Sequence, residues 1–291
     1  MFTKYHFRAP RFVVSLLDEN RTPALIMVGM PFTLSHPAAA IPFLRTRLVP
    51  SALVIGCMAP DFEYFLHFAP EGGFGHTLTG AFLFDLPWAL IMLWLFHVYA
   101  KEPLYAWLPE SVRRRIRLGP AALPIRNFAQ LALVLLSILI GVATHILWDS
   151  FTHPNFWPYE HWQFLHRTVE FPVYGTMEYL RVLQHGSTLF GAAAILLWFI
   201  LWFRRTAPIE PETATYVGKS HRGALFVIAI VALFAAVLRV EILAGPGSLY
   251  YDTGKKELIA RAIITAMDVF WLGVLVYGVW RARPRNKLRD A

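Results

Sequence analysis

The hydrophobic positions of the chain gather in five long apolar segments, which are separated by polar and mostly basic stretches. These segments are 79–99, 128–148, 187–203, 223–243 and 262–280. Each is close to the length that an α-helix needs to cross the hydrocarbon core of a bilayer, roughly 20 residues. Pro87 lies inside the first segment, and we expect it to kink that helix without ending it. The pattern predicts an all-α, polytopic integral membrane helix bundle with about five long transmembrane helices.

A further apolar stretch, residues 34–68, is too broken to form one clean span. Four prolines divide it: Pro37, Pro42, Pro50 and Pro60. Proline removes a backbone donor and interrupts a helix, so such a segment is stable at membrane depth only when the bundle buries it. We therefore expect a proline-broken helical hairpin, or a re-entrant element, near the N-terminus.

The composition supports a membrane protein. Hydrophobic residues make up 56% of the 291 residues and charged residues only 16%, with a mean hydropathy of +0.47; soluble domains carry about 25% charged residues. The single cysteine, Cys57, excludes an internal disulfide framework and a cysteine-based zinc cluster. The net charge of +8 comes from basic blocks between the apolar segments, which is typical of membrane topology, and we predict no nucleic-acid partner.

The basic residues alternate between the two sides of the predicted bundle. Segments 101–127, 204–222 and 281–291 carry fifteen Lys and Arg residues, whereas the intervening loops 149–187 and 244–261 carry five. The positive-inside rule places the first group, and with it the C-terminus, in the cytoplasm. Residues 1–47 carry six more, which conflicts with an outer location of the N-terminal region.

Histidines and carboxylates recur where the chain would leave the membrane on the outer side. The candidates are His36, Asp61, His76, His145, Asp149, His153, His166 and Glu170. Helical residues four apart share a face, so His145 and Asp149 point the same way, and His153 extends that line. A single span over 48–68 would place His36 on the opposite side, so His36 joins this group only if 37–60 enters the membrane and returns.

Imidazole nitrogens and carboxylate oxygens are ligands of hydrolytic zinc sites, and a carboxylate within a span is costly unless it is paired or bound to a cation. The pattern therefore predicts a metal site. A hydrogen-bonded pair that joins two helices is the alternative for His145 and Asp149. For the other histidines and Glu170 the alternative is an ordinary residue of an interface, a core or a wet loop, and His161 is a possible substitute for His153.

Four stretches carry a family resemblance: MPFTLSHPAA from Met30, APDFEYF, GHT and THILWDSFTHP. They resemble the signature of an uncharacterised bacterial membrane-protein family, domain of unknown function 4184, over most of residues 30–205. That pattern is similar in turn to membrane proteins described as metal-dependent hydrolases. The resemblance implies a protein of the bacterial cytoplasmic membrane. It divides the chain into an N-terminal extension at 1–29, a metal-site membrane domain at 30–205, and a two-helix segment with a basic tail at 206–291.

A more distant resemblance is to zinc-dependent phospholipase C, whose ligand order this chain repeats. The resemblance implies one zinc at Asp61, His76, His145 and Asp149, and a second at His36 with Asp149 shared. It implies a third at His153, His166 and Glu170, on the weakest matches, so we expect one or two ions. The phospholipase also uses its N-terminal amine as a ligand, which cannot be matched here because 35 residues precede His36.

The predicted function is a metal-dependent hydrolase that acts at the outer membrane face on a phosphoester, either a phospholipid or a lipid-linked phosphate. Asp149 would bridge two ions and Asp61 would orient or deprotonate the attacking water. Membrane lipid is thus the environment and the candidate substrate. The alternative is a non-enzymatic polytopic protein of transport or assembly with a structural or vestigial metal site.

Overall fold

The structure is a computed structural model that describes residues 33–119, 121–123, 125–154, 156–172, 175–209, 220–244 and 255–282. The predicted extension at 1–29 lies outside the described residues, and so does the tail from residue 283. The described helices and strands are η1 (Thr33–Phe43), α2 (Pro50–Gly56), η2 (Ala59–Asp61), α3 (Phe62–His67), α4 (Leu78–Gly80), η3 (Ala81–Asp85), α5 (Leu86–Leu95), η4 (Phe96–Ala100), α6 (Lys101–Trp107), α7 (Glu110–Arg113), α8 (Phe128–Ser150), α9 (Trp157–His161), η5 (Gln163–His166), β1 (Thr168–Phe171), β2 (Gly175–Glu178), α10 (Tyr179–Arg205), α11 (Ser220–Ala244) and α12 (Lys255–Ala282). The elements η1, η2 and η5 are 3₁₀-helices, and η3 and η4 are π-helical turns.

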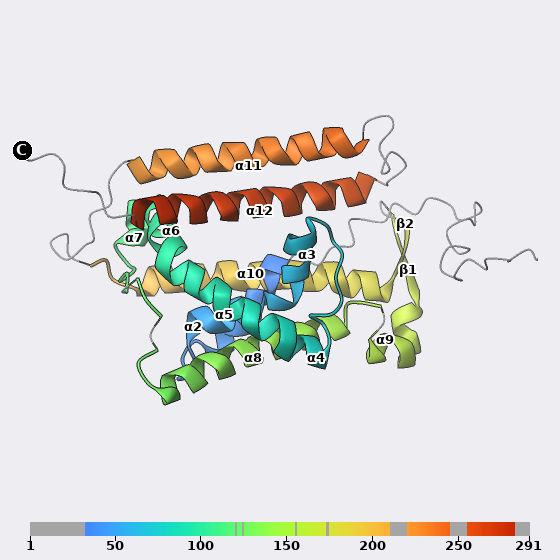
Figure 1. Ribbon diagram of the computed structural model, residues 1–291. Coiled ribbons are helices and arrows are strands. Elements are labelled where there is room, and N and C mark those ends of the chain that lie inside the picture. The colour runs from blue at the N-terminus through green and yellow to red at the C-terminus, as the bar shows by residue number, and fades with distance from the viewer. Residues whose placement is uncertain are drawn as a thin grey trace, which may run out of the picture.

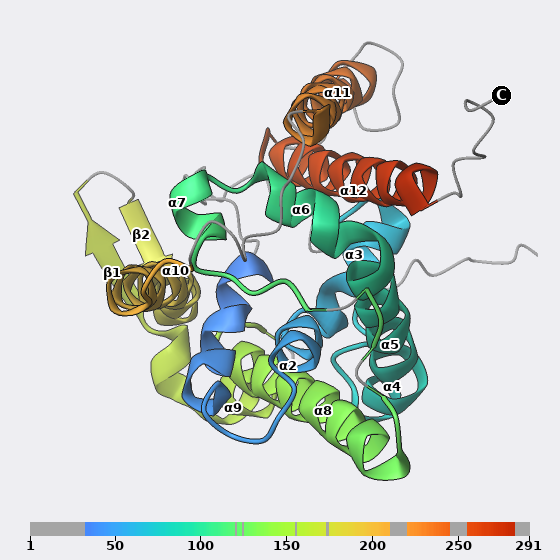
Figure 2. The ribbon, with the colours of Figure 1, turned by 90° about the vertical axis from the view of Figure 1, so that its left-hand side faces the viewer.

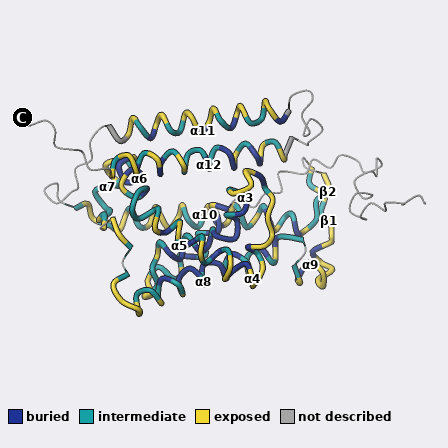
Figure 3. Tube along the Cα trace, viewed as in Figure 1, coloured by how far each residue is buried: buried dark blue, intermediate teal, exposed yellow. Residues whose placement is uncertain are grey.

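Five described helices are long and apolar enough to cross a membrane, which confirms the predicted helical membrane protein. They cover Leu78–Trp107, Phe128–Ser150, Tyr179–Arg205, Arg222–Leu243 and Glu257–Ala282. In Figure 1, α10, α11 and α12 run in nearly the same direction, and the first span and α8 lie obliquely to them. Many large apolar side chains on α10 and α11 are exposed, which is the expected state of a surface that faces lipid (Figure 3).

The first span continues past Pro87, as predicted. Pro87 stands at the start of α5, directly after the π turn η3, and a second π turn follows at η4. A proline ring clashes with the carbonyl four residues earlier, and a wider turn is one way in which a helix accommodates this.

The proline-broken stretch forms short helical pieces inside the bundle, as expected. Figure 2 shows η1 between α10 and α8, and α2 packed along α8. Gly56 of α2 and Gly141 of α8 allow this contact, because a Cβ at Gly141 would collide with backbone atoms of Leu53, Gly56 and Cys57. The amide of Val49, at the start of α2, donates to the Ser137 hydroxyl of α8 at 2.9 Å, which pairs a backbone group that lipid could not pair.

The loops at one end of the bundle gather the polar candidates. The end of α8, the starts of α4 and α10, α9 and the two strands all lie at this end, whereas α6 and α7 lie at the other (Figure 1). The strands pair antiparallel, with Val169 opposite Met177 and Glu170 opposite Thr176. This short hairpin is the one sheet among the described residues, in a fold that is otherwise helical. The α12 helix is tied to the same end by Arg261, whose Nη2 donates to Glu71 Oε1 at 2.6 Å.

The contact between α2 and α8 is open to a direct test with matched glycine substitutions. Gly141→Val should lower the free energy of unfolding by about 1–3 kcal/mol, because the added side chain meets fixed backbone. Gly186→Val is the control, since a Cβ at Gly186 of α10 meets no atom within 4 Å. Thermal unfolding in detergent measures both. Equal melting temperatures for the two variants would contradict the close contact.

Candidate metal centre

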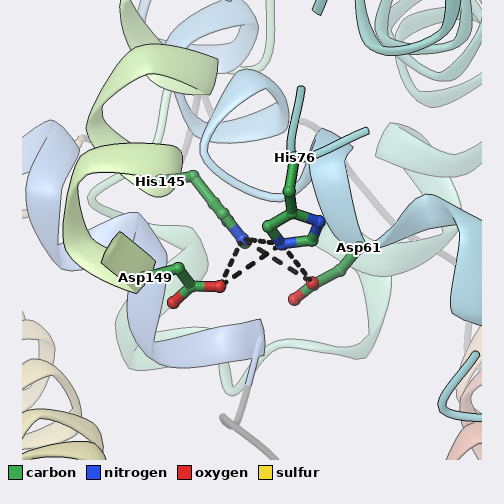
Figure 4. A group of neighbouring side chains, drawn as sticks. All are labelled: Asp61, His76, His145 and Asp149. Atoms are coloured by element: carbon green, nitrogen blue, oxygen red, sulfur yellow. Dashed lines mark hydrogen bonds and ion pairs between the residues drawn. The ribbon is translucent and has the colours of Figure 1, made fainter. Parts of the chain in front are cut away.

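Two histidines and two aspartates converge at the polar end of the bundle. Asp61 ends η2, His76 lies in the loop before α4, and His145 and Asp149 occupy the last turns of α8. One ligand atom from each lies within 4.8 Å of the others (Figure 4). Asp61, His145 and Asp149 are buried, and the side chain of His76 is 12% exposed. The structure therefore brings together four of the candidate residues, which three separate segments supply.

The spacing of these atoms fits a tetrahedral ion. His145 Nε2 and His76 Nε2 lie 3.2 Å and 3.3 Å from Asp149 Oδ2, and they are 3.3 Å from each other. Each also lies 3.6 Å from Asp61 Oδ1. Ligand atoms about 2.0–2.1 Å from a zinc ion in a tetrahedron lie about 3.3–3.4 Å apart. The four side chains therefore need little movement to hold one ion.

The tautomer of His145 is fixed by its second ring nitrogen. His145 Nδ1 lies 2.7 Å from the carbonyl oxygen of Cys57, at the end of α2. A carbonyl oxygen only accepts, so Nδ1 carries the proton and donates it. With an ion bound, Nε2 of the neutral imidazole would present its lone pair to that ion, as a metal ligand must.

The two oxygens of Asp149 face different partners. Oδ2 faces His76 and His145, whereas Oδ1 lies 3.4 Å from His36 Nε2 and 3.5 Å from His153 Nδ1. The His36 ring stacks on His145 with centroids 3.9 Å apart, and burial lowers the pKa of His36 to about 3, so its imidazole is neutral. The proline-broken stretch thus brings His36 to the cluster, which is the condition that its candidacy as a ligand depended on.

One family model matches most of the chain. The model of the family described as "Domain of unknown function (DUF4184)" matches residues 30–279. The chain belongs to the DUF4184 family. No curated protein and no solved structure matches it. The match is wider than the resemblance seen in the sequence, because it extends past residue 205 through α11 and most of α12.

The structure of this DUF4184 protein does not bring His166 and Glu170 to the cluster. His166 ends η5 and donates from Nε2 to the Tyr159 carbonyl at 2.7 Å. His166 and Glu170 are both exposed. Glu170 lies in β1, so its spacing of four from His166 does not place the two on one helix face. His161 also points elsewhere, since its Nδ1 donates to the Trp157 carbonyl at 2.9 Å.

Glu63, which the sequence analysis passed over, shapes the loop that carries His76. Its carboxylate accepts from the backbone amides of Gly73, Phe74 and Gly75, the last two at 3.2 Å. Thr77 then caps α4 by accepting from the Gly80 amide at 2.9 Å. His76 is thus held between a fixed loop and a capped helix. The glycine-rich GGFG that follows Glu63 was the available signal.

Asp61 shows why the cluster favours a cation. Burial raises the pKa of its carboxyl, and so does the neighbouring Asp149, whereas His145 and His76 act in the opposite direction. Two buried carboxylates a few ångströms apart repel each other unless a positive charge lies between them.

Glu63→Gln tests the support of His76. The amide loses the negative charge and replaces one acceptor with a donor that faces backbone N–H groups, so the loop should shift. We expect Zn²⁺ affinity to fall by about 10–100-fold, the usual effect of removing such support. Competition with a chromogenic chelator measures it. Glu160→Gln, at an exposed position of α9, is the control, and the same affinity in both variants would contradict this role.

Proposed function

We propose that this protein is a membrane-embedded, metal-dependent hydrolase of phosphoesters carried by lipids. The observation that carries the proposal is the convergence of Asp61, His76, His145 and Asp149 at distances of 3.2–3.6 Å. Two imidazoles and two carboxylates form a nitrogen and oxygen set that suits zinc, which we propose as the cofactor. Such an ion would lower the pKa of a bound water and polarise a phosphoryl oxygen.

The protein's own residues divide the remaining tasks. The Cys57 carbonyl orients the His145 ring, so that its Nε2 would bind the ion. Asp149, one turn later on the same helix face, would supply a carboxylate oxygen beside it. Asp61 is fully buried beside them, and its carboxylate is the proposed acceptor for the proton of the attacking water. His76 is the exposed member of the four, so a substrate reaches the centre past His76 and its ring neighbour Phe156.

A lipid substrate is supported by the surroundings of the centre. Trp157, Trp162, Phe164 and Phe151 are exposed, and their rings form a contiguous patch in which Trp162 contacts the other three. Exposed aromatic rings at the end of a membrane span are typical of the boundary between headgroups and hydrocarbon. The patch lies at the same end of the bundle as the metal centre (Figure 1). The phosphate of a lipid would sit at this depth.

We further propose that the centre lies on the outer side of the cytoplasmic membrane and the C-terminus in the cytoplasm. The support is the excess of Lys and Arg in 101–127, 204–222 and 281–291.

Cysteine labelling tests this orientation, because the native Cys57 is buried and gives little background. A membrane-impermeant maleimide should label Glu160→Cys in intact cells. Arg117→Cys, which is exposed at the other end, should react only after the membrane is permeabilised. The opposite result would place the centre in the cytoplasm.

A structural metal site is the second candidate function, and one observation favours it. Four protein ligands converge, three of them buried, and a closed set of four ligands is typical of structural zinc. In that case the protein would bind zinc at full occupancy and hydrolyse nothing, as a membrane protein of transport or assembly.

Metal analysis and activity measured on the same preparations separate the two candidates. We expect stoichiometric zinc in the wild type and loss of zinc in Asp149→Asn, which keeps the size of the side chain. Phosphodiester hydrolysis in lipid–detergent micelles should fall at least about 100-fold in that variant, because the ion that activates the water is gone.

Two control variants should keep both zinc and activity. His97→Gln changes a histidine of the first span that bonds to Ser51 instead of the cluster, and Glu170→Gln changes the exposed strand residue. Zinc without hydrolysis in the wild type would favour the structural site. No bound metal would contradict both candidates.

A further inference from the structure

A chain of hydrogen-bonding side chains connects α10 to Asp149. Arg181 Nη1 donates to Gln184 Oε1 at 2.8 Å, and Gln184 Nε2 lies 3.0 Å from His153 Nε2. His153 Nδ1 in turn faces Asp149, with the backbone carbonyl at 3.3 Å and Oδ1 at 3.5 Å. Gln184 is only 1% exposed, so its amide is a buried polar group whose partners matter.

The guanidinium fixes the direction of this chain. Arg181 has only N–H donors, so the Gln184 atom that faces it is the oxygen. The amide nitrogen of Gln184, a donor, therefore faces His153 Nε2. That ring nitrogen must accept, so it carries no proton and its lone pair is occupied by the amide.

The surroundings of the other ring nitrogen lead independently to the same tautomer. His153 Nδ1 is flanked by oxygens: Thr152 Oγ1 at 3.1 Å, the Asp149 carbonyl and Asp149 Oδ1. A ring nitrogen that faces a carbonyl and a carboxylate is the one that carries the proton. The neutral imidazole thus donates to the backbone carbonyl of Asp149 and accepts from the Gln184 amide.

We propose that His153 is a positioning residue that holds the last turn of α8 at Asp149, through an Nδ1–H that donates to the Asp149 carbonyl and lies 3.5 Å from its Oδ1, and that Gln184 and Arg181 set its tautomer. This replaces the sequence-based assignment of His153 as a ligand, because a protonated nitrogen cannot bind a metal and the other nitrogen is engaged. It rests on the metal centre of the proposed function. It also implies one ion per chain, since among the described residues the Oδ1 side of Asp149 keeps only His36 as a candidate ligand.

The substitution that tests the chain is Gln184→Glu. A carboxylate beside Arg181 offers His153 only acceptors, so the proton should move to Nε2 and the Asp149 carbonyl should lose the imidazole as a donor. We expect Zn²⁺ affinity, measured by chelator competition, to fall about 10–100-fold. Ser187→Ala is the control on the same helix, because the Ser187 hydroxyl donates to the Gln184 backbone carbonyl and does not touch the amide. Its affinity should match the wild type.

The position of the proton on the His153 ring is a second measurement. It should change in Gln184→Glu only if Gln184 sets the tautomer, and not if Gln184 merely supports the fold. Nitrogen-15 NMR of histidine-labelled protein, in nanodiscs and without metal, should report Nδ1–H for His153 in the wild type and Nε2–H in Gln184→Glu. With ¹¹³Cd²⁺ bound, coupling should appear at His76 and His145 and be absent at His153.

Cadmium coupling to His153, or an Nε2–H tautomer in the wild type, would overturn the proposal, as would unchanged Zn²⁺ affinity in Gln184→Glu. Metal binding without hydrolysis would contradict only the proposed function, because affinity and proton position are measured without a substrate.

Discussion

The close approach of α2 to α8 is the contact on which the candidate metal centre depends. Gly56 and Gly141 let two backbones meet, and this meeting has three consequences for the site. It sets the Cys57 carbonyl against His145, it ends α2 where η2 can carry Asp61 to the cluster, and it buries the hairpin that contains His36. A bilayer offers little hydrophobic driving force between helices, so small residues that permit van der Waals contact and side-chain hydrogen bonds such as that of Ser137 must hold such a hairpin.

The spans and the main cluster could be predicted from sequence because their signals are local. A run of about twenty apolar residues predicts a membrane-spanning helix. On such a helix, a spacing of four places His145 and Asp149 on the same face. The arrival of Asp61, His76 and His36 is a tertiary property. It was predicted only because buried carboxylates and histidines at one membrane face need partners, and through the family resemblance.

The same local reasoning failed where the chain was not helical. A spacing of four would place His166 and Glu170 on one face only if both lay on the same helix, but His166 ends η5 and Glu170 lies in the strand β1. Glu63 was passed over because its partners are backbone amides, which no side-chain pattern marks. Gln184 is uncharged and lies within a span, so only the arrangement of Arg181 and His153 around it gives it a role.

The charge balance of the centre connects these observations. With an ion bound, His145 would be a neutral donor to the Cys57 carbonyl, while His153 donates to the Asp149 carbonyl and burial keeps His36 uncharged. Asp61 and Asp149 then contribute two negative charges at the end of a membrane span, where uncompensated charge is costly. One divalent ion would neutralise both and would also bind the facing nitrogens of His76 and His145. The two charges of such an ion would balance those of the two carboxylates. Metal binding should therefore stabilise the fold as well as supply the chemistry, since ligand bound only by the folded state adds to the free energy of unfolding.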